Sequence, residues 1–533
     1  MSSSVQPSTA PGPGPGPGRT PRLQVSDVTV VDQSLMRRAV TGTIVGNTME
    51  WYDVGVYGYL ALTMGQVFLP TAESSVQVLF SLGVFASTYV ARPLGGIVLG
   101  RLGDRIGRQK VLAATLILMA ASTFAIGLLP THAAVGALAP VILVVLKLLQ
   151  GFSTGGEYAG ATTFVSEHAP DRRRGFFASV LDTGSYMGFA LGAAVVSAPH
   201  LLIGQQAILD GGWRIPFLIA GPLGIVAIHF RLRIEETPAF QAHLDAQEAA
   251  GHGDGSQVTG APGTASMVRT LWRPILIAMT LVAAANTLAY ALTSYMPTYL
   301  TDTLGYDAVH GTLLTIPVLV VMSLCIPLAG RLSDRIGRRP VLWLGSVSAI
   351  ALSVPAFLLL AHGAVWSTLT GLSLIAVPVT FYVSNLTSAF PALFPTRARY
   401  GAMGISYNVA VALFGGTSPL IIESILQATG NQLSPAFYMM GMSVLGAVAV
   451  WFMRESSCRP LPGSMPSVAS AQEAEELVAN QDDSPFLDLS ELPFEALRVP
   501  DAVLALGSNA AVVPGSNAVT SAPTGAGRTT GSH

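Results

Sequence analysis

The chain has 533 residues, of which 50% are hydrophobic and 11% charged, whereas charged residues make up about 25% of a typical soluble domain. The formal net charge of −2 excludes a basic nucleic-acid-binding surface, and the two cysteines, Cys325 and Cys458, exclude a disulfide framework or a thiol metal site. The composition indicates an integral membrane protein.

The first 36 residues are polar and contain the low-complexity run PGPGPGPG from Pro11 to Gly18. They do not read as a signal peptide, and we expect residues 1–36 to form a disordered cytoplasmic arm. Twelve apolar segments follow, each long enough to cross a hydrocarbon core roughly 30 Å thick. They lie near residues 39–63, 76–100, 111–130, 137–163, 176–200, 213–231, 273–298, 309–330, 341–361, 364–390, 400–425 and 434–453. The predicted fold class is an all-α polytopic membrane protein with twelve transmembrane helices.

Arginine and lysine are concentrated in the loops that follow the even-numbered segments, for example at residues 101–110, 172–174 and 331–339. The loops that follow the odd-numbered segments hold none, and Arg214, at the start of the sixth segment, is the nearest exception. Because short loops rich in these residues stay on the cytoplasmic side, we expect both termini to be cytoplasmic. The expected location is the plasma membrane, which is the inner membrane of a bacterium.

An internal repeat divides the chain in two. GRLGDRIGRQKVL, which starts at Gly100, and GRLSDRIGRRPVL, which starts at Gly330, agree at ten of thirteen positions. The repeat predicts two six-helix halves, with a cytoplasmic loop between them and a largely disordered cytoplasmic tail after them. The predicted bounds are 37–232, 233–272, 273–453 and 454–533. Paired six-helix halves are typical of secondary transporters, whose substrate site lies near the membrane midplane between the halves.

The Gly-x-x-x-Asp-Arg-x-Gly-Arg pattern of both copies resembles the signature of the major facilitator superfamily. Its glycines allow a tight turn, and its charged residues can form ion pairs that break and re-form as the halves rock. We therefore expect a conformational switch at Gly100, Asp104, Arg105, Gly107, Arg108, Gly330, Asp334, Arg335, Gly337 and Arg338.

Further segments resemble the metabolite:proton symporter branch of that superfamily, among them GNTMEWYDVGVYGYLA from Gly46 and LLQGFSTGGEYAGA from Leu148. LDTGSYMGFALGA, from Leu181, is most similar to proline/glycine betaine transporters. The resemblance implies proton-coupled import of a small zwitterionic osmolyte such as proline or glycine betaine. Proton symport of organic acids such as dicarboxylates is the first alternative, and a transport-dead membrane sensor is the second. Residues 466–533 lack the heptad repeat of the coiled coil that ends the best-known osmosensing members.

Charged residues inside the apolar segments are costly and usually functional. We expect Glu50, Asp53 and Glu157 to carry the proton, with Arg92 and Lys147 as their partners. The alternative is a set of static ion pairs that fix helix packing. Asp182 is expected to pair with the arginine loop at residues 172–174.

Aromatic and amide side chains inside the segments are the candidates for binding the solute, because an aromatic face attracts a quaternary ammonium by about 0.5–2 kcal/mol. The candidates are Trp51, Tyr52, Tyr57, Tyr158, Asn286, Tyr290, Tyr382 and Asn385. Such residues also gather at membrane interfaces for reasons unrelated to a ligand.

No enzyme activity, cofactor or metal is predicted, since the nine histidines are scattered along the chain. The one Gly-x-Ser-x-Gly match, at residues 151–155, lies in the middle of a predicted helix, where a nucleophile elbow cannot form. The expected partners are a small-molecule substrate, protons and the lipid bilayer, with no nucleic acid. The glycines at positions 184, 188 and 192 predict close packing of the fifth segment against a neighbouring helix.

Overall fold

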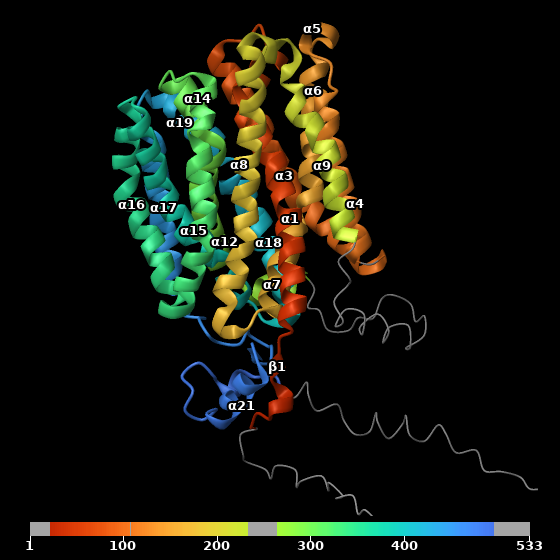
Figure 1. Cartoon of the computed structure of the whole chain (residues 1–533), viewed down its shortest axis with the longest axis vertical. Coiled ribbons are helices and arrows are strands. Elements are labelled where there is room, and N and C mark those ends of the chain that lie inside the picture. Colours follow the sequence, from red (N-terminus) through yellow and green to blue (C-terminus); the bar gives the residue numbers. More distant parts are fainter. Residues whose placement is uncertain (1–21, 107, 233–263, 495–533) are drawn as a thin grey trace, which may run out of the picture. The chain divides into compact units, whose positions relative to one another are not determined.

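The computed structural model describes residues 22–106, 108–232 and 264–494, and its helices follow the twelve predicted apolar segments (Figure 1). The first half contains α1 (Gln33–Tyr59), α2 (Ala61–Phe68), α3 (Ser74–Ile106), α4 (Arg108–Gly127), α5 (His132–Val135), α6 (Leu138–Thr154), α7 (Glu157–His168), α8 (Arg174–Ala207) and α9 (Arg214–Leu232). The second half contains α12 (Trp272–Tyr290), α13 (Met296–Thr298), α14 (Ala308–Leu313), α15 (Thr315–Ile336), α16 (Arg338–Ala361), α17 (Val365–Ala389), α18 (Thr396–Ala410), α19 (Ser418–Thr429) and α20 (Ser434–Phe452). A short helix, α11 (Thr264–Thr270), precedes α12.

Nine helical runs in the described ranges are long and apolar enough to cross a membrane. The other three crossings are α1 with α2, whose hydropathy is lowered by residues such as Glu50 and Asp53, and α4 and α9. The last two contain the shorter apolar stretches Ala114–Gly127 and Arg214–Val226. Together these twelve crossings make up the predicted architecture.

Four of the crossings are interrupted, which the apolar pattern did not predict. The first bends at Leu60, and the fourth breaks at Gly155 and Gly156 between α6 and α7. The seventh and eleventh contain wide π-helical turns, at Ala291–Tyr295 and Val411–Gly415. Such turns are rare and often mark functional sites in helices. The turn at Ala291–Tyr295 contributes Thr293 to the cavity described below, and Gly415 of the other turn packs against Asn286 and Tyr290, which also line it.

Glycines bring helix backbones into contact within the first half. A Cβ atom at Gly151 of α6 would overlap the carbonyl oxygen of Thr88 on α3. A Cβ atom at Gly184 of α8 would lie 2.8 Å from the carbonyl oxygen of Ile44 on α1, and one at Gly188 would overlap the carbonyl oxygen of Thr48. The predicted packing stripe on the fifth segment therefore faces α1, which α8 contacts along its length.

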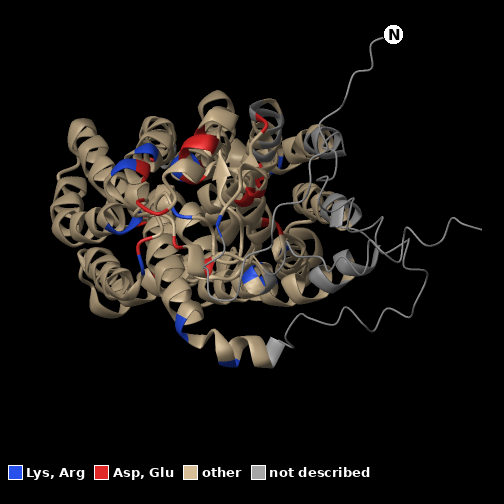
Figure 2. Ribbon diagram, turned by 90° about the horizontal axis from the view of Figure 1, so that it is seen from below, with Lys and Arg blue, Asp and Glu red and all other residues tan. Residues whose placement is uncertain are grey.

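The two halves meet through α8, which packs against α15 and α17. At the end of the bundle where α15 and α20 finish, called here the tail end, Asp334 accepts hydrogen bonds from the backbone N–H groups of Gly175 (2.7 Å) and Phe176 (2.8 Å). Arg338 pairs with the same carboxylate at 2.8 Å. The second copy of the repeated motif thus caps the first turn of α8 across the halves. Figure 2 shows acidic and basic residues close together at this end.

The side-chain contacts of the first copy of the motif are not described. Gly107 lies outside the described residues, as do the side chains of Asp104, Arg105 and Arg108 and the surroundings of Gly100. The contacts of the motif in which a switch is predicted are therefore described at its second copy alone.

Part of the predicted disordered arm and tail is ordered, which differs from the expectation for residues 1–36 and 454–533. Strand β1 (Thr29–Val30) pairs in parallel with β2 (Ser467–Val468), and α21 (Ala471–Ala479) packs beside them. Val28, Val468 and Ala474 form a small apolar cluster. Neither segment holds enough apolar residues for a core of its own, so the order comes from their pairing. Residues 22–32 and 466–492 are called here the terminal lobe.

The segment between α20 and the terminal lobe binds both halves. Glu455 accepts hydrogen bonds from the backbone N–H groups of Arg338 (2.9 Å) and Arg339 (3.0 Å) at the start of α16. Arg174 of the first half donates to the carbonyl oxygen of Arg459 at 2.9 Å. The tail therefore connects the two halves at the tail end.

Candidate functional site

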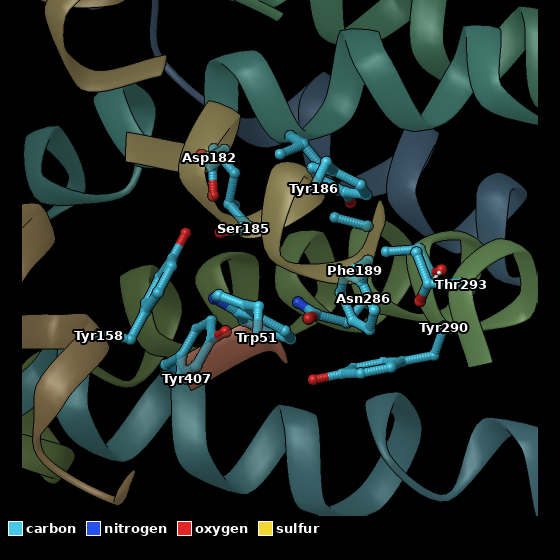
Figure 3. Close-up of a pocket in the computed structure, with 14 residues that line it drawn as sticks. Trp51, Tyr158, Asp182, Ser185, Tyr186, Phe189, Asn286, Tyr290, Thr293 and Tyr407 are labelled. Carbon is cyan, nitrogen blue, oxygen red and sulfur yellow. Dashed lines mark hydrogen bonds between the residues drawn. The ribbon is translucent and has the colours of Figure 1, made fainter. Parts of the chain in front are cut away.

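A narrow cavity lies between the two halves (Figure 3). Its walls come from α1, α7 and α8 of the first half and from α12, α17, α18 and the π-helical turn after α12 in the second. The lining residues are Trp51, Tyr158, Asp182, Ser185, Tyr186, Phe189, Ala285, Asn286, Ala289, Tyr290, Thr293, Val383, Leu386 and Tyr407. We call this space the central cavity.

Aromatic rings dominate the lining and meet across the halves. The rings of Tyr158 and Tyr407 stack with their centroids 4.0 Å apart and their planes 14° apart. Trp51 lies 5.3 Å from the Phe189 ring on its own half and 6.1 Å from the Tyr290 ring on the other. Ring contacts therefore connect the two halves at the central cavity.

Four of the eight predicted substrate residues line this cavity: Trp51, Tyr158, Asn286 and Tyr290. Asn286 also donates to the Val282 carbonyl oxygen of its own helix at 3.0 Å.

The other four predicted residues lie inside one half or the other. Tyr52 donates its hydroxyl to the Pro216 carbonyl oxygen at 2.8 Å, and the ring of Tyr57 faces the Lys147 ammonium at 4.5 Å. The hydroxyl of Tyr382 is 2.7 Å from that of Ser346, and Asn385 donates to the Phe381 carbonyl oxygen at 2.9 Å. The lining of the central cavity includes none of these four side chains.

Sequence reasoning missed the contribution of α8 to the cavity. Asp182, Ser185, Tyr186 and Phe189 recur with the i, i+3, i+4, i+7 spacing of one helix face, a signal that was available. Tyr407 of α18 carried no comparable signal.

The structure corrects the expectation that Asp182 pairs with the arginine loop at residues 172–174. Arg174 pairs with Asp171, and Arg172 lies 3.6 Å from Glu473 of the terminal lobe. The arginines at 172 and 174 are engaged at the tail end, and no ion pair to Asp182 is seen in the described part of the chain.

The predicted proton-coupling residues separate into two groups. In the first, Nη2 of Arg92 lies 3.3 Å from Oε1 of Glu50, and both side chains are at most 3% exposed. Arg92 also donates to the Thr154 carbonyl oxygen at 3.4 Å, and its guanidinium carbon lies 5.8 Å from the centroid of the Tyr407 ring. Because Tyr407 lines the central cavity, this ion pair is separated from the cavity by one aromatic ring.

The second group is a hydrogen-bonded chain inside the first half. Thr123 donates to Asp53 Oδ2 at 3.0 Å, Gln150 donates to the Thr123 hydroxyl at 2.9 Å, and Lys147 donates to Gln150 Oε1 at 2.5 Å. Asp53 and Lys147 are thus bridged by two neutral side chains. Neither Gln150 nor Thr123 of α4 is among the predicted proton-coupling residues.

Glu157 lies in the first turn of α7, directly after the break in the fourth crossing, and is 6% exposed. The break itself is contacted from the second half. Asn408 donates to the Gly155 carbonyl oxygen at 2.6 Å, and the Tyr400 hydroxyl donates to the Gly156 carbonyl oxygen at 3.4 Å. Movement of α18 relative to the first half would therefore alter these backbone contacts next to Glu157.

Two six-helix halves around a cavity, with buried charges beside it, define a secondary transporter. Residues 39–463 match the family described as "Sugar (and other) transporter", and the chain belongs to this family. It is 52% identical over 478 residues to the ectoine/proline transporter of Corynebacterium glutamicum, covering 89% of this chain and 95% of the relative. It is 42% identical over 462 residues to the proline/betaine transporter of Escherichia coli K12, covering 87% and 92%.

Among solved structures, a proton:xylose symporter of the major facilitator superfamily aligns with a TM-score of 0.64 at 20% identity. The alignment covers 83% of this chain and 99% of the symporter. The predicted fold class and the family resemblance are confirmed, and the chain is a transporter rather than an enzyme.

Proposed function

We propose that the protein is a proton-coupled symporter that imports a small zwitterionic osmolyte such as proline or glycine betaine. The relatives named as ectoine/proline and proline/betaine transporters support this substrate class, because they match almost the whole chain at 52% and 42% identity. The observation that carries the proposal is the chemistry of the central cavity.

The described lining of the central cavity contains aromatic rings, an amide, hydroxyls and a carboxylate, and no lysine, arginine or histidine. Ring faces attract a methylated ammonium by about 0.5–2 kcal/mol each. A dicarboxylate would instead need cationic partners, and the guanidinium of Arg92, which lies behind Tyr407, pairs with Glu50. The lining therefore favours a solute with a positively charged nitrogen over the organic-acid alternative.

Proton coupling is assigned to the buried charges of the first half. Protonation of Glu50 would release Arg92 from its ion pair. Only the Tyr407 ring would separate the freed guanidinium from the bound solute. Protonation of Asp53 would weaken its attraction for Lys147 through the chain formed by Thr123 and Gln150. Glu157 is the third candidate because it adjoins the break that α18 contacts. A buried charge in a membrane protein is costly enough that its neutralisation can shift a conformational equilibrium.

The orientation follows from the positive residues at the tail end, which favour the cytoplasmic side of a bacterial inner membrane. In that orientation both termini are cytoplasmic, and the contacts of Asp334 with α8 close the cytoplasmic side. Their release would open the central cavity to the cytoplasm.

Uptake of labelled glycine betaine, proline and succinate tests the proposal, in cells that lack their own carriers for these solutes. Each solute is measured with and without a protonophore, and cells with an empty vector provide the background. We expect uptake of glycine betaine or proline that collapses with the protonophore, and no uptake of succinate. Succinate uptake alone would establish the organic-acid alternative, and no uptake of any solute would favour the transport-dead sensor.

A further inference from the structure

The carboxylate of Asp182 differs from the other membrane carboxylates whose contacts are known. It lines the central cavity and is 4% exposed, yet its Oδ2 atom has no hydrogen-bond partner in the described residues. By contrast, Glu50 pairs with Arg92 and Asp53 accepts a hydrogen bond from Thr123. Glu423 accepts from Tyr295 at 2.9 Å and from Gln427 at 2.8 Å.

Among the described residues, polar groups of the cavity lining lie around Asp182, and no ion pair to it is seen. The hydroxyl of Thr387 on α17 interacts with the carboxylate, but its geometry falls short of a hydrogen bond, since Thr387 Oγ1 and Asp182 Oδ2 both lack a partner. Arg174 and Arg172 of the adjacent loop are engaged with Asp171 and Glu473. A buried charge without a partner is unfavourable, so this position suits a cation that is supplied from outside the chain.

Aromatic rings complete the environment of the carboxylate. Tyr158 and Tyr186 line the central cavity together with Asp182, and Tyr158 stacks on Tyr407 from the other half. In Figure 3 the hydroxyl end of Tyr158 points toward Asp182, and Trp51 and Tyr407 lie nearer the other end of the Tyr158 ring. A carboxylate beside several ring faces is the combination that binds an alkylated ammonium, which offers charge but few or no N–H donors.

We propose that Asp182 is the anionic anchor that binds the positively charged nitrogen of the solute in the central cavity. This inference rests on the proposed function and deepens it, because it assigns a residue to substrate charge selection. The carboxylate attracts the ammonium of a zwitterion and repels a solute that carries only negative charge. Asp182 is thereby distinguished from Glu50 and Asp53, whose partners lie within the protein.

The test uses the full-length protein in proteoliposomes and two solutes of the same shape. Glycine betaine carries a trimethylammonium group, and tert-butylacetate is its carbon isostere without the positive charge. Wild type is compared with Asp182→Asn, with Asp182→Glu, and with Asp210→Asn as a neutralisation control at an exposed carboxylate. Net uptake driven by a proton gradient and solute exchange without a gradient are both measured.

We expect Asp182→Asn to raise the KM for glycine betaine by about tenfold or more in both net uptake and exchange. The same change should reduce the wild-type preference for glycine betaine over tert-butylacetate as an inhibitor. Asp182→Glu should retain part of the preference, and Asp210→Asn should match wild type. An unchanged KM in Asp182→Asn would overturn the proposal, as would normal exchange with loss of uphill accumulation, which indicates a proton carrier.

Failure of the proposed function is distinguishable from failure of this inference. If wild type transports glycine betaine and Asp182→Asn behaves identically, only the anchor is wrong, whereas no zwitterion transport by wild type removes both. If Asp182→Asn does not fold, protection of wild type against thermal unfolding by the two solutes decides the question. Protection by glycine betaine alone supports the anchor, and equal protection by tert-butylacetate overturns it.

Discussion

The buried ion pair between Glu50 and Arg92 can be tested by a double-mutant cycle. The two charged groups are 3.3 Å apart and their side chains are at most 3% exposed, so removal of one partner leaves an uncompensated buried charge. Such a change costs about 3–5 kcal/mol. For Glu50→Gln we expect about 3 kcal/mol, at the lower end of that range, because Arg92 keeps its contacts with the Thr154 carbonyl and with the rings of Tyr89 and Tyr407.

Glu50→Gln, Arg92→Gln and the double variant are purified in detergent, and chemical unfolding gives the free energy of unfolding of each. We expect the double variant to lose less stability than the sum of the two single losses, because neither charge then remains unpaired. The same preparations are reconstituted for transport. If the pair couples proton movement to transport, the double variant should exchange solute but fail to accumulate it against a gradient.

Additive losses of stability would refute the energetic pairing of Glu50 and Arg92. Normal uphill accumulation by a stable double variant would refute the coupling role and leave a static ion pair that fixes helix packing. The two measurements therefore separate the structural role of the pair from its role in transport.

Three further predictions concern the packing of the helices and the closure of the tail end. Gly151→Ala should destabilise the protein by about 1–3 kcal/mol because the new methyl group would overlap the Thr88 carbonyl; thermal unfolding measures the loss. Asp334→Asn should weaken the cap on α8 and widen the tail end, measured as the distance between spin labels at the ends of α8 and α15. Glu455→Gln should weaken the two bonds to the start of α16 and increase proteolysis of the tail.

Each of these predictions has a control or an outcome that contradicts it. Gly83→Ala on α3, where an added Cβ meets nothing within 4 Å, should be neutral; equal losses at Gly151 and Gly83 would contradict the packing argument. Unchanged label distances in Asp334→Asn would show that the cap does not hold the halves together. Wild-type resistance to protease in Glu455→Gln would show that the tail is held by its other contacts.

The sequence was sufficient to predict the twelve membrane crossings and the duplicated halves. Hydrophobicity is a property of each segment by itself, and a repeat is visible without any knowledge of packing. The sequence also indicated which residue types inside the crossings carry chemistry, since Glu50, Asp53, Arg92 and Lys147 stand out against an apolar background.

How those residues are grouped was decided by the tertiary structure. The sequence placed the charged groups in one set, whereas the structure pairs Glu50 with Arg92 and links Asp53 to Lys147 through Thr123 and Gln150. Helical spacing shows which residues share a face, but not which neighbour that face meets.

The same limit applies to the central cavity and to the termini. Tyr158 and Tyr407 belong to opposite halves of the sequence and stack in space, and Leu23 bonds to Gln481, which lies 458 positions further along the chain. The membrane fixes where each helix crosses because burial of apolar side chains is a local requirement. The site arises only when helices from both halves pack together, because its polar groups find their partners, or are left without them as Asp182 Oδ2 is, in contacts that no single segment encodes.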